Sequence, residues 1–324
     1  MTITVSRDPR VAPLIWDLLD KAKINNGIIT VGTHDGGFHA DELLSIAMIK
    51  VAISEVDTYH GPDIHVNVIR TRNLEKLKQC DIVVDVGGGE FDHHSTDDRY
   101  PNGVPKSACG KVLEAVEPND KLVKLLNIMG LYLVQSIDNG DPISKAKWIK
   151  YQPSHFSWVG LMNPTYSERY DPEASDLWFN KALDMVEIVY RRLRQSCLDF
   201  MASKEVLSKC PRYLGGALLE LPSSSVQWKP YVLSRNHSVK AVMYPHQDGM
   251  WCVRMVPRSF SDSTPYHRFP EEWRSDAKAI AGNTQIASKG YSLGCKFAHK
   301  GGHLANFDTK DHAIEAADYV FRHL

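Results

Sequence analysis

An apolar run passes directly into glycines, histidines and aspartates in the stretch IITVGTHDGGFHAD, residues 28–41, and this order decides the fold. The β-branched first half is typical of a buried strand, which places the polar half beyond the carboxyl end of that strand. A second stretch, DIVVDVGGGEFDHH at residues 81–94, has the same order. Because both strand ends carry imidazoles and carboxylates, the sequence predicts a metal site at the edge of a sheet.

Helices and strands alternate around these two stretches. The hydrophobic periodicity predicts helices at Pro13–Ile24, His39–Ile53 and Leu74–Cys80, and strands at Ile28–Thr33, His65–Arg70 and Asp81–Val86. This alternation is the pattern of an α/β fold with a doubly wound, mainly parallel sheet. Ligands of such sheets bind beyond the carboxyl ends of the strands, where both clusters of histidines lie.

The remainder of the chain predicts further helices and a second, smaller domain. A polar loop is expected at residues 95–105, a sharp turn at residues 138–142 and irregular structure at residues 148–172. Helices are expected at Ser107–Val116, Lys121–Ile137, Asp176–Lys204 and Thr309–Leu324, and strands at Leu214–Leu219, Ser238–Tyr244, Met250–Val256 and Leu293–His299. We place the domain boundary near Lys209. Residues 1–209 then form a metal-binding catalytic domain with a long linker helix, and residues 210–324 a substrate-binding domain of α/β or α+β type.

The composition is that of an ordinary globular protein, with 43% hydrophobic and 24% charged residues, and a length of 324 residues favours two domains. A net charge of −1 excludes a polycationic coat, so nucleic-acid binding would need a local basic groove. Six cysteines without a C-x-x-C pair argue against a zinc ribbon or a disulfide scaffold and favour a reducing compartment. No signal peptide, membrane span or Arg-rich transit peptide is evident. We therefore expect a cytoplasmic or nuclear protein, with a mitochondrial location as the alternative.

Seven residues of the two stretches are candidate metal ligands or catalytic groups: His34, His39, Asp41, Asp85, Asp92, His93 and His94. Asp85 is the clearest, because it interrupts a run of valines and a buried carboxylate is costly unless it is paired or bound to a metal. The alternative is a polar loop rim in which Asp41 caps the helix that it opens. Paired sites of imidazoles and carboxylates hold two metal ions about 3.5–4 Å apart and hydrolyse phosphoesters. The residues therefore predict a metal-dependent phosphoesterase.

Two further candidate sites, for a metal and for a phosphate, are explained equally simply by local turns of the chain. Asp138 lies at a helix C-terminus, where a carboxylate opposes the helix dipole, and either a metal or a turn with Asn139-Gly140 explains it. The segment FAHKGGHL, residues 297–304, places two glycines between cationic side chains, which suits either a phosphate contact or a glycine turn on the surface. Core packing or stacking on bases explains three tryptophans of the second domain, Trp228, Trp251 and Trp273.

These motifs resemble the DHH phosphoesterase superfamily, and more closely its MYG (melanocyte proliferating gene) exonuclease branch. The similarity extends over nearly the whole chain and is carried first by residues 32–42, 80–87, 92–94 and 138–140. Further matches to the branch are found at residues 161–165, Trp228-Lys229 and Trp273-Arg274. The resemblance implies a metal-dependent phosphodiester hydrolase that acts on single-stranded RNA as a 3′-to-5′ exonuclease.

The resemblance also implies a role for each matching residue. One Mn²⁺ ion would be bound by His34, His39 and Asp85, and a second by Asp41, Asp85, His93 and Asp138, with Mg²⁺ as the alternative metal. His94 would face the substrate phosphate, and Asp92 would orient a histidine. In the second domain the substrate would be contacted by the segment His299, Lys300, Gly301, Gly302 and His303, with the phosphate contact at either histidine.

Two other functions are compatible with the residues. A small-molecule phosphodiesterase or pyrophosphatase is favoured by the nearly neutral net charge and by the absence of a long basic stretch. A regulatory protein that keeps the metal site without turnover is the other alternative. The intact ligands at every motif position argue against it, because a degenerate site need not keep them.

Overall fold

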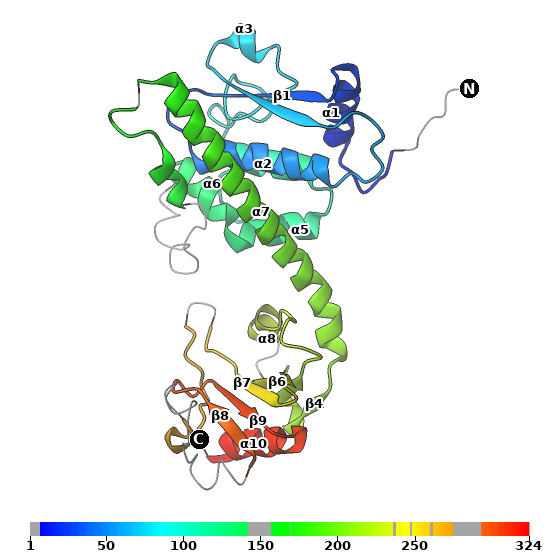
Figure 1. Ribbon diagram of the computed structural model, residues 1–324, viewed down its shortest axis with the longest axis vertical. Helices are drawn as coiled ribbons and strands as arrows, with labels where there is room; N and C mark the ends of the chain where they lie inside the picture. Colours follow the sequence, from blue (N-terminus) through cyan, green and yellow to red (C-terminus); the bar gives the residue numbers. More distant parts are fainter. Residues whose placement is uncertain are drawn as a thin grey trace, which may run out of the picture. The chain divides into compact units, whose positions relative to one another are not determined.

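The computed structural model describes residues 7–141, 157–168, 170–235, 238–246, 248–259, 262–274 and 293–323. The chain forms two compact units, residues 1–197 and 198–324 (Figure 1). The division falls inside helix α7 (Pro172–Lys209), which extends beyond both ends of the helix predicted at residues 176–204. The first unit therefore ends before the boundary that we placed near Lys209, which is the last residue of α7.

The first unit is built on a parallel sheet with the strand order β2-β1-β3. Strands β1 (Ile28–Thr33) and β2 (His65–Arg70) have the predicted bounds and pair along their full length. Strand β3 is shorter than predicted and comprises only Ile82–Val83, because the chain turns at Asp85, whose φ is 60°. The parallel strands and their connecting helices confirm the predicted α/β class.

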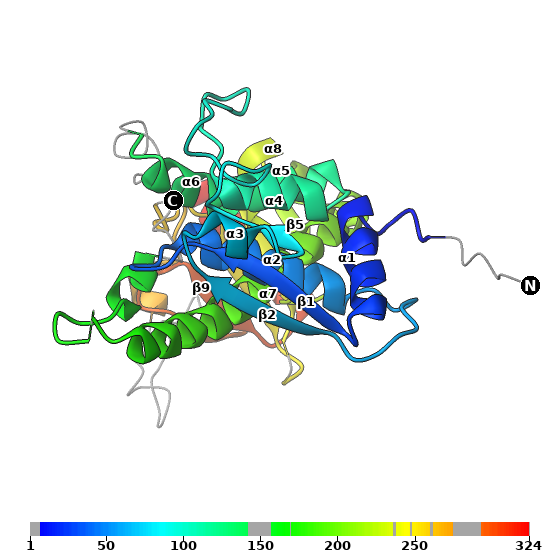
Figure 2. The same ribbon diagram turned by 90° about the horizontal axis from the view of Figure 1, so that it is seen from above.

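Helices cover both faces of this sheet (Figures 1 and 2). On one face α3 (Leu74–Leu77) approaches Gly32 so closely that a Cβ atom there would lie 2.9 Å from Cδ2 of Leu77. On the other face lies α2 (Ala40–Ser54), in which eleven of the 15 residues are buried. It also packs against α1 (Pro13–Ile24) and α4 (Ala108–Val116), and it is the central helix of the unit. The first turn of α2, which follows the carboxyl end of β1 in the chain, is therefore buried as well.

The single helix predicted at residues 121–137 is wrong. The chain forms α5 (Asp120–Leu126), a π-helical turn (Asn127–Leu131) and α6 (Tyr132–Asp138). Gly130 has a φ of 151°, which breaks the regular helix at a position where only glycine is comfortable. The turn predicted after α6 is confirmed at Asn139 and Gly140. Of the segment expected to be irregular, residues 157–162 form a 3₁₀ helix, and residues 148–156 lie outside the described residues.

The second unit contains a six-stranded sheet with the order β4-β5-β6-β7-β9-β8, in which only β5 and β6 are parallel. The strands are β4 (Arg212–Tyr213), β5 (Leu218–Glu220), β6 (Ala241–Pro245), β7 (Trp251–Met255), β8 (Cys295–Ala298) and β9 (Leu304–Phe307). Its helices are α8 (Lys229–Arg235) and α10 (Lys310–His323). The strand predicted at residues 214–219 is half wrong, because a 3₁₀ turn at Leu214–Gly216 replaces its first part. The sequence also missed β4, β9 and α8.

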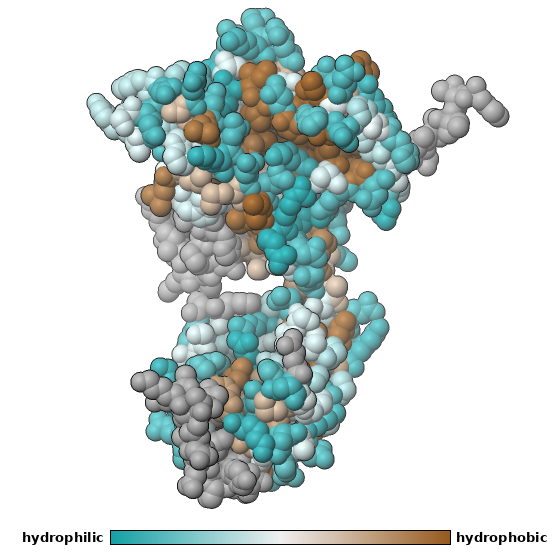
Figure 3. Space-filling view, in the orientation of Figure 1, coloured by the Kyte–Doolittle hydropathy of each residue, from teal (hydrophilic) through white to brown (hydrophobic). Residues whose placement is uncertain are grey.

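Apolar residues pack on both faces of the second sheet. One core joins Phe269, Trp273 and Phe307 to the alanines of α10, and the other contains Trp228 and Val242. Core packing is therefore the confirmed explanation for Trp228 and Trp273. On the face of the molecule in Figure 3 hydrophobic and hydrophilic residues are interspersed. Among the described residues, no helix has both the length and the apolar character that a membrane span requires.

Candidate metal centre

Asp85 lies at the centre of a cluster of imidazoles and carboxylates at the carboxyl end of the first sheet. Its side chain is 3% exposed, and its φ of 60° is unusual for a residue other than glycine. One carboxylate oxygen, Oδ2, lies 3.4 Å from Nε2 of His34, and the other, Oδ1, lies 3.2 Å from Nε2 of His93. The turn at Asp85 thus directs one oxygen toward each of the two sequence stretches. Strained backbone of this kind is found at functional sites, where the surrounding structure holds it in place.

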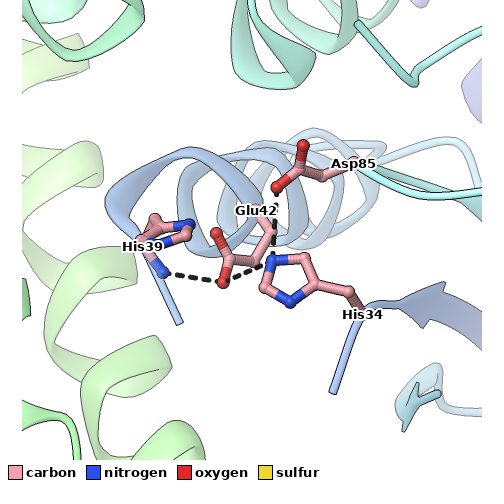
Figure 4. A group of neighbouring side chains, drawn as sticks. All are labelled: His34, His39, Glu42 and Asp85. Carbon is pink, nitrogen blue, oxygen red and sulfur yellow. Dashed lines mark hydrogen bonds and ion pairs between the residues drawn. The ribbon is translucent and has the colours of Figure 1, made fainter. Parts of the chain in front are cut away.

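The first group of potential ligands surrounds Oδ2 of Asp85 and consists of His34, His39, Glu42 and Asp85 (Figure 4). One ligand atom from each lies within 4.8 Å of the others. His34 follows β1, whereas Glu42 belongs to the first turn of α2 and lies 3.3 Å from Nε2 of His34. The backbone N–H of His39 donates to Glu42 at 2.7 Å, so the N-cap of α2 is part of the cluster. The imidazole of His39 is exposed.

The second group surrounds Oδ1 of Asp85 and consists of Asp41, Asp85, His93 and Asp138. Nε2 of His93 lies 3.0 Å from Asp138 and 3.9 Å from Asp41. The other ring nitrogen of His93 lies 3.1 Å from the side-chain oxygen of Asn139, which fixes the ring in the way that partners of metal-bound histidines do. Asp138 is the last residue of α6, where the helix dipole disfavours a carboxylate. Its close contact with His93 offsets this unfavourable position.

Asp41 holds the start of a neighbouring helix rather than the helix that it opens. Its carboxylate accepts hydrogen bonds from the hydroxyl of Ser107 and from the backbone N–H groups of Ala108 and Cys109, both at 2.9 Å. These donors form the N-terminus of α4, which favours negative charge. Complete burial and the nearby carboxylates of Asp138 and Asp85 nevertheless raise the pKa of Asp41 to about 8.

The loop at residues 92–94 presents a third set of atoms, in which His94 joins Asp85 and His93. Asp92 accepts hydrogen bonds from the backbone N–H of His94 at 3.0 Å and from that of Gly88 at 2.8 Å. It also lies 2.7 Å from Nδ1 of His94, which orients a ring that is 63% exposed. From α4, Nζ of Lys111 donates to the backbone carbonyl of Asp92 at 2.8 Å. The loop is therefore held in place both by the hydrogen bonds of the Asp92 side chain and by a hydrogen bond from α4.

Interactions between imidazoles and carboxylates determine the pKa values in the cluster. Burial alone would lower the pKa of His34 and of His93, but their hydrogen bonds to carboxylates raise both to about 10. Burial would likewise raise the pKa of Asp85, yet the hydrogen bonds to both histidines lower it to about 2. Metal ligation requires neutral imidazoles, so a bound cation would replace these protons.

The donor set fits a divalent metal ion. Imidazole and carboxylate together suit ions of intermediate hardness such as Mn²⁺. Several buried side-chain atoms of the described residues have no well-formed hydrogen bond, and three of them belong to this cluster: Oε2 of Glu42, Oδ1 of Asp85 and Nε2 of His93. Such atoms are costly unless a partner satisfies them, and all three belong to the two groups of potential ligands.

The loop between β1 and α2 depends on two residues that the sequence did not single out as functional. The side chain of Asn163 accepts from the backbone N–H of Phe38 and donates to its carbonyl, both at 2.7 Å. Arg70 stacks on the ring of Phe38 and donates to the carbonyl of Gly36. Glu42 lies at the end of the motif at residues 32–42, in which the sequence assigned it no role, and the structure places it in a helix capping box with His39.

The segment predicted to contact substrate, residues 299–303, is the turn between β8 and β9 in the second unit. The rings of His299 and His303 lie 4.3 Å apart, and Nδ1 of His299 accepts from the N–H of Gly301 at 3.0 Å. Burial, the neighbouring imidazole of His299 and the cations Arg254 and Lys229 lower the pKa of His303. The turn is therefore both a glycine turn and part of a basic cluster.

The structure brings together eight of the predicted site residues: His34, His39, Asp41, Asp85, Asp92, His93, His94 and Asp138. They come from four separate segments of the first unit. The five residues of the β8–β9 turn form their own cluster in the second unit. The roles assigned to all of them remain predictions.

Most of the chain is similar to known proteins. The family model MYG1_exonuc, described as an uncharacterised protein family (UPF0160), matches residues 30–320. A protein of Mus musculus named MYG1 exonuclease is 26% identical over 89% of this chain and 83% of that protein. A MYG1 protein of Chlamydia muridarum is 26% identical over 90% of this chain and 96% of that protein. A solved structure of the exonuclease RecJ bound to manganese covers 97% of this chain and 96% of that chain, at 16% identity. Its TM-score of 0.27 is too low to support an inference about this chain.

Proposed function

Because this chain belongs to the MYG1_exonuc family, we propose that it is a two-metal phosphodiester hydrolase that shortens single-stranded RNA from the 3′ end. The observation that carries the proposal is the position of Asp85. Its two carboxylate oxygens face two different groups of potential ligands, as a carboxylate that bridges two ions would. The relatives named exonucleases support nucleic acid as the substrate class.

Each group would hold one ion, most simply Mn²⁺. His34, His39 and Asp85 would bind the first, and the second would be bound by Asp41, Asp85, His93 and Asp138. Two ions bound in these groups would supply a nucleophile at neutral pH and stabilise charge on the attacking and leaving oxygens. The protein's part is to fix the ligands, and the hydrogen bonds of Asn139 and of the α4 N-terminus do this for His93 and Asp41.

His94 would contact the phosphate that is cleaved. Asp92 holds Nδ1 of His94, which leaves Nε2 of an exposed ring for a phosphate oxygen. A histidine that is paired with a carboxylate in this way can carry a proton and donate it from the other ring nitrogen. Asp92 would thus orient His94 without touching the substrate itself.

The basic cluster of the second unit would bind the phosphates of the chain being shortened. Lys229 and Arg254 approach His303, and burial together with Arg254 lowers the pKa of Lys229. Like charges that are brought together in this way favour an anion between them. Backbone phosphates carry no sequence information, so we expect cleavage without strong sequence preference that weakens as salt rises.

The test is a comparison of substrates with Mn²⁺ present. A labelled single-stranded RNA with a free 3′ end should be shortened stepwise, whereas the same RNA blocked at that end should resist. A matched single-stranded DNA shows whether the enzyme selects RNA. The rival activity, on small phosphodiesters or pyrophosphate, is favoured by the net charge of −1. Efficient hydrolysis of these small substrates without any shortening of RNA would establish the rival instead.

A further inference from the structure

The carboxylate of Glu42 occupies the first ligand group but has no part in the proposed mechanism so far. We propose that Glu42 is itself a ligand of the ion bound by His34, His39 and Asp85, so that this ion has two imidazole and two carboxylate ligands. The inference rests on the proposed use of metal ions, and it adds a ligand that neither the sequence motifs nor the comparisons assign.

The geometry around His34 carries the inference. Nε2 of His34 faces two carboxylates at nearly equal distances, 3.3 Å from Oε1 of Glu42 and 3.4 Å from Oδ2 of Asp85. Together with His39 these residues offer four ligand atoms that lie within 4.8 Å of one another (Figure 4). An ion placed among these atoms would have two imidazole and two carboxylate ligands.

The second oxygen of Glu42 gives an independent reason. A glutamate in a capping box needs one carboxylate oxygen, and Oε1 of Glu42 accepts from the backbone N–H of His39 in that role. Glu42 is fully buried, and Oε2 has no hydrogen-bond partner among the described residues. A buried carboxylate oxygen without a partner is costly, which a helix cap alone does not explain. The Glu42 carboxylate offers a ligand atom within 4.8 Å of those of His34, His39 and Asp85, so an ion bound there is the partner that we propose for it.

Charge balance points the same way. Asp85 belongs to both groups, so its single negative charge would be divided between two divalent ions. The second group has two carboxylates of its own, Asp41 and Asp138. Without Glu42 the first group would have none, whereas with Glu42 both ions receive at least one carboxylate that is not shared.

The variant E42Q separates a metal ligand from a helix cap. Glutamine has the same shape and also serves as the acceptor in a capping box, so α2 should keep its N-terminus. It lacks the charge, and an amide oxygen binds Mn²⁺ far more weakly than a carboxylate oxygen does. We expect the dissociation constant of one of two Mn²⁺ ions to rise about 100-fold, in line with the loss of a ligand. The other ion should remain bound, and the melting temperature of the metal-free protein should stay within a few degrees of the wild type.

Free Mn²⁺ can be counted by electron paramagnetic resonance during a titration of the full chain, without reference to activity. The matched control is E90Q, which removes an exposed carboxylate close in sequence to residues 92–94 and should leave both ions bound. If E42Q binds two ions with wild-type affinities, Glu42 is only a helix cap and the inference is wrong, while the proposed hydrolase stands. If the wild type binds no Mn²⁺ at all, the proposed function fails as well.

A second variant covers the case in which E42Q does not fold. E42D keeps the negative charge but shortens the side chain by one methylene, so the carboxylate can no longer reach both His34 and the backbone of His39. Weakened binding of one ion to folded E42D would support the inference, and wild-type binding of both ions would contradict it.

Discussion

The two ligand groups that share Asp85 differ in how firmly the protein holds them without metal. In the second group Asp41 accepts three hydrogen bonds from the start of α4, and Asn139 fixes His93. In the first group the imidazole of His39 is exposed. The second group is therefore organised before an ion arrives, whereas the first is completed by the ion. We expect the second group to bind its ion more tightly, because less ordering accompanies binding there.

The largest loss of activity and metal binding is expected when a ligand shared by both groups is removed. Asp85→Ala removes the carboxylate that faces both of them, so we expect both ions to be lost and activity to fall about 10³-fold or more. The first unit should still fold, which circular dichroism can check, while metal content and RNA cleavage are measured. Wild-type turnover of this variant with Mn²⁺ would rule out the two-metal mechanism.

The pH dependence of metal binding tests the protons that hold each group. His34 and His93 have pKa values raised to about 10 in the metal-free protein, and only their neutral forms bind a metal. The first ion should therefore displace about one proton, from His34, and its affinity should rise about tenfold per pH unit below pH 10. The second ion should displace one proton from His93 and, below pH 8, another from Asp41, so its affinity should rise more steeply there. Calorimetric titrations of Mn²⁺ in two buffers with different ionisation enthalpies count the protons that are released. If the measured heats of Mn²⁺ binding do not depend on the buffer, no protons are released, and both imidazoles are already neutral before the metal binds.

Asn139→Ala should loosen the second group without removing a ligand. The side chain of Asn139 holds the ring of His93, and the loss of such a partner lowers metal affinity about 10–100-fold. Only one ion should be affected, which makes this variant the counterpart of E42Q in the first group. If both ions weaken equally, the two groups are not separate sites.

The smallest effect is expected outside both groups. His303→Ala should raise KM for RNA or lower kcat by about tenfold, because it removes one phosphate contact and leaves the metal ligands untouched. His299→Ala, compared with it, shows which of the two histidines contacts the phosphate. A change in Mn²⁺ content in either variant would contradict the assignment of this turn to substrate binding.

Much of the first unit could be predicted from the sequence because its elements are strongly periodic. The bounds of α1, β1 and β2 were predicted correctly, and apolar runs in short strands leave few alternatives. The convergence of the two histidine stretches followed from a general rule, that parallel strands present their carboxyl ends at one edge of the sheet.

What could not be predicted depends on tertiary contacts. The isolated Gly130 gave no signal of a break, because a single glycine is tolerated in many helices. Strand β9 contains no β-branched residue and is stabilised by its pairing with β7 and β8. The role that we propose for Glu42 could not be predicted, because its spacing from His39 is also that of a helix capping box. The burial of its second oxygen distinguishes a metal ligand from a helix cap.

Helix α4 contributes no metal ligand, yet it links the two histidine stretches. Its N-terminus holds Asp41 of the first stretch, and Lys111, about one turn later, holds Asp92 of the second. A helix rotates its side chains by about 100° for each residue added. One inserted residue between Ala108 and Lys111 would therefore turn the lysine away from its partner while every ligand stayed in the sequence. Homologous chains should accept many substitutions in this turn but no change in its length.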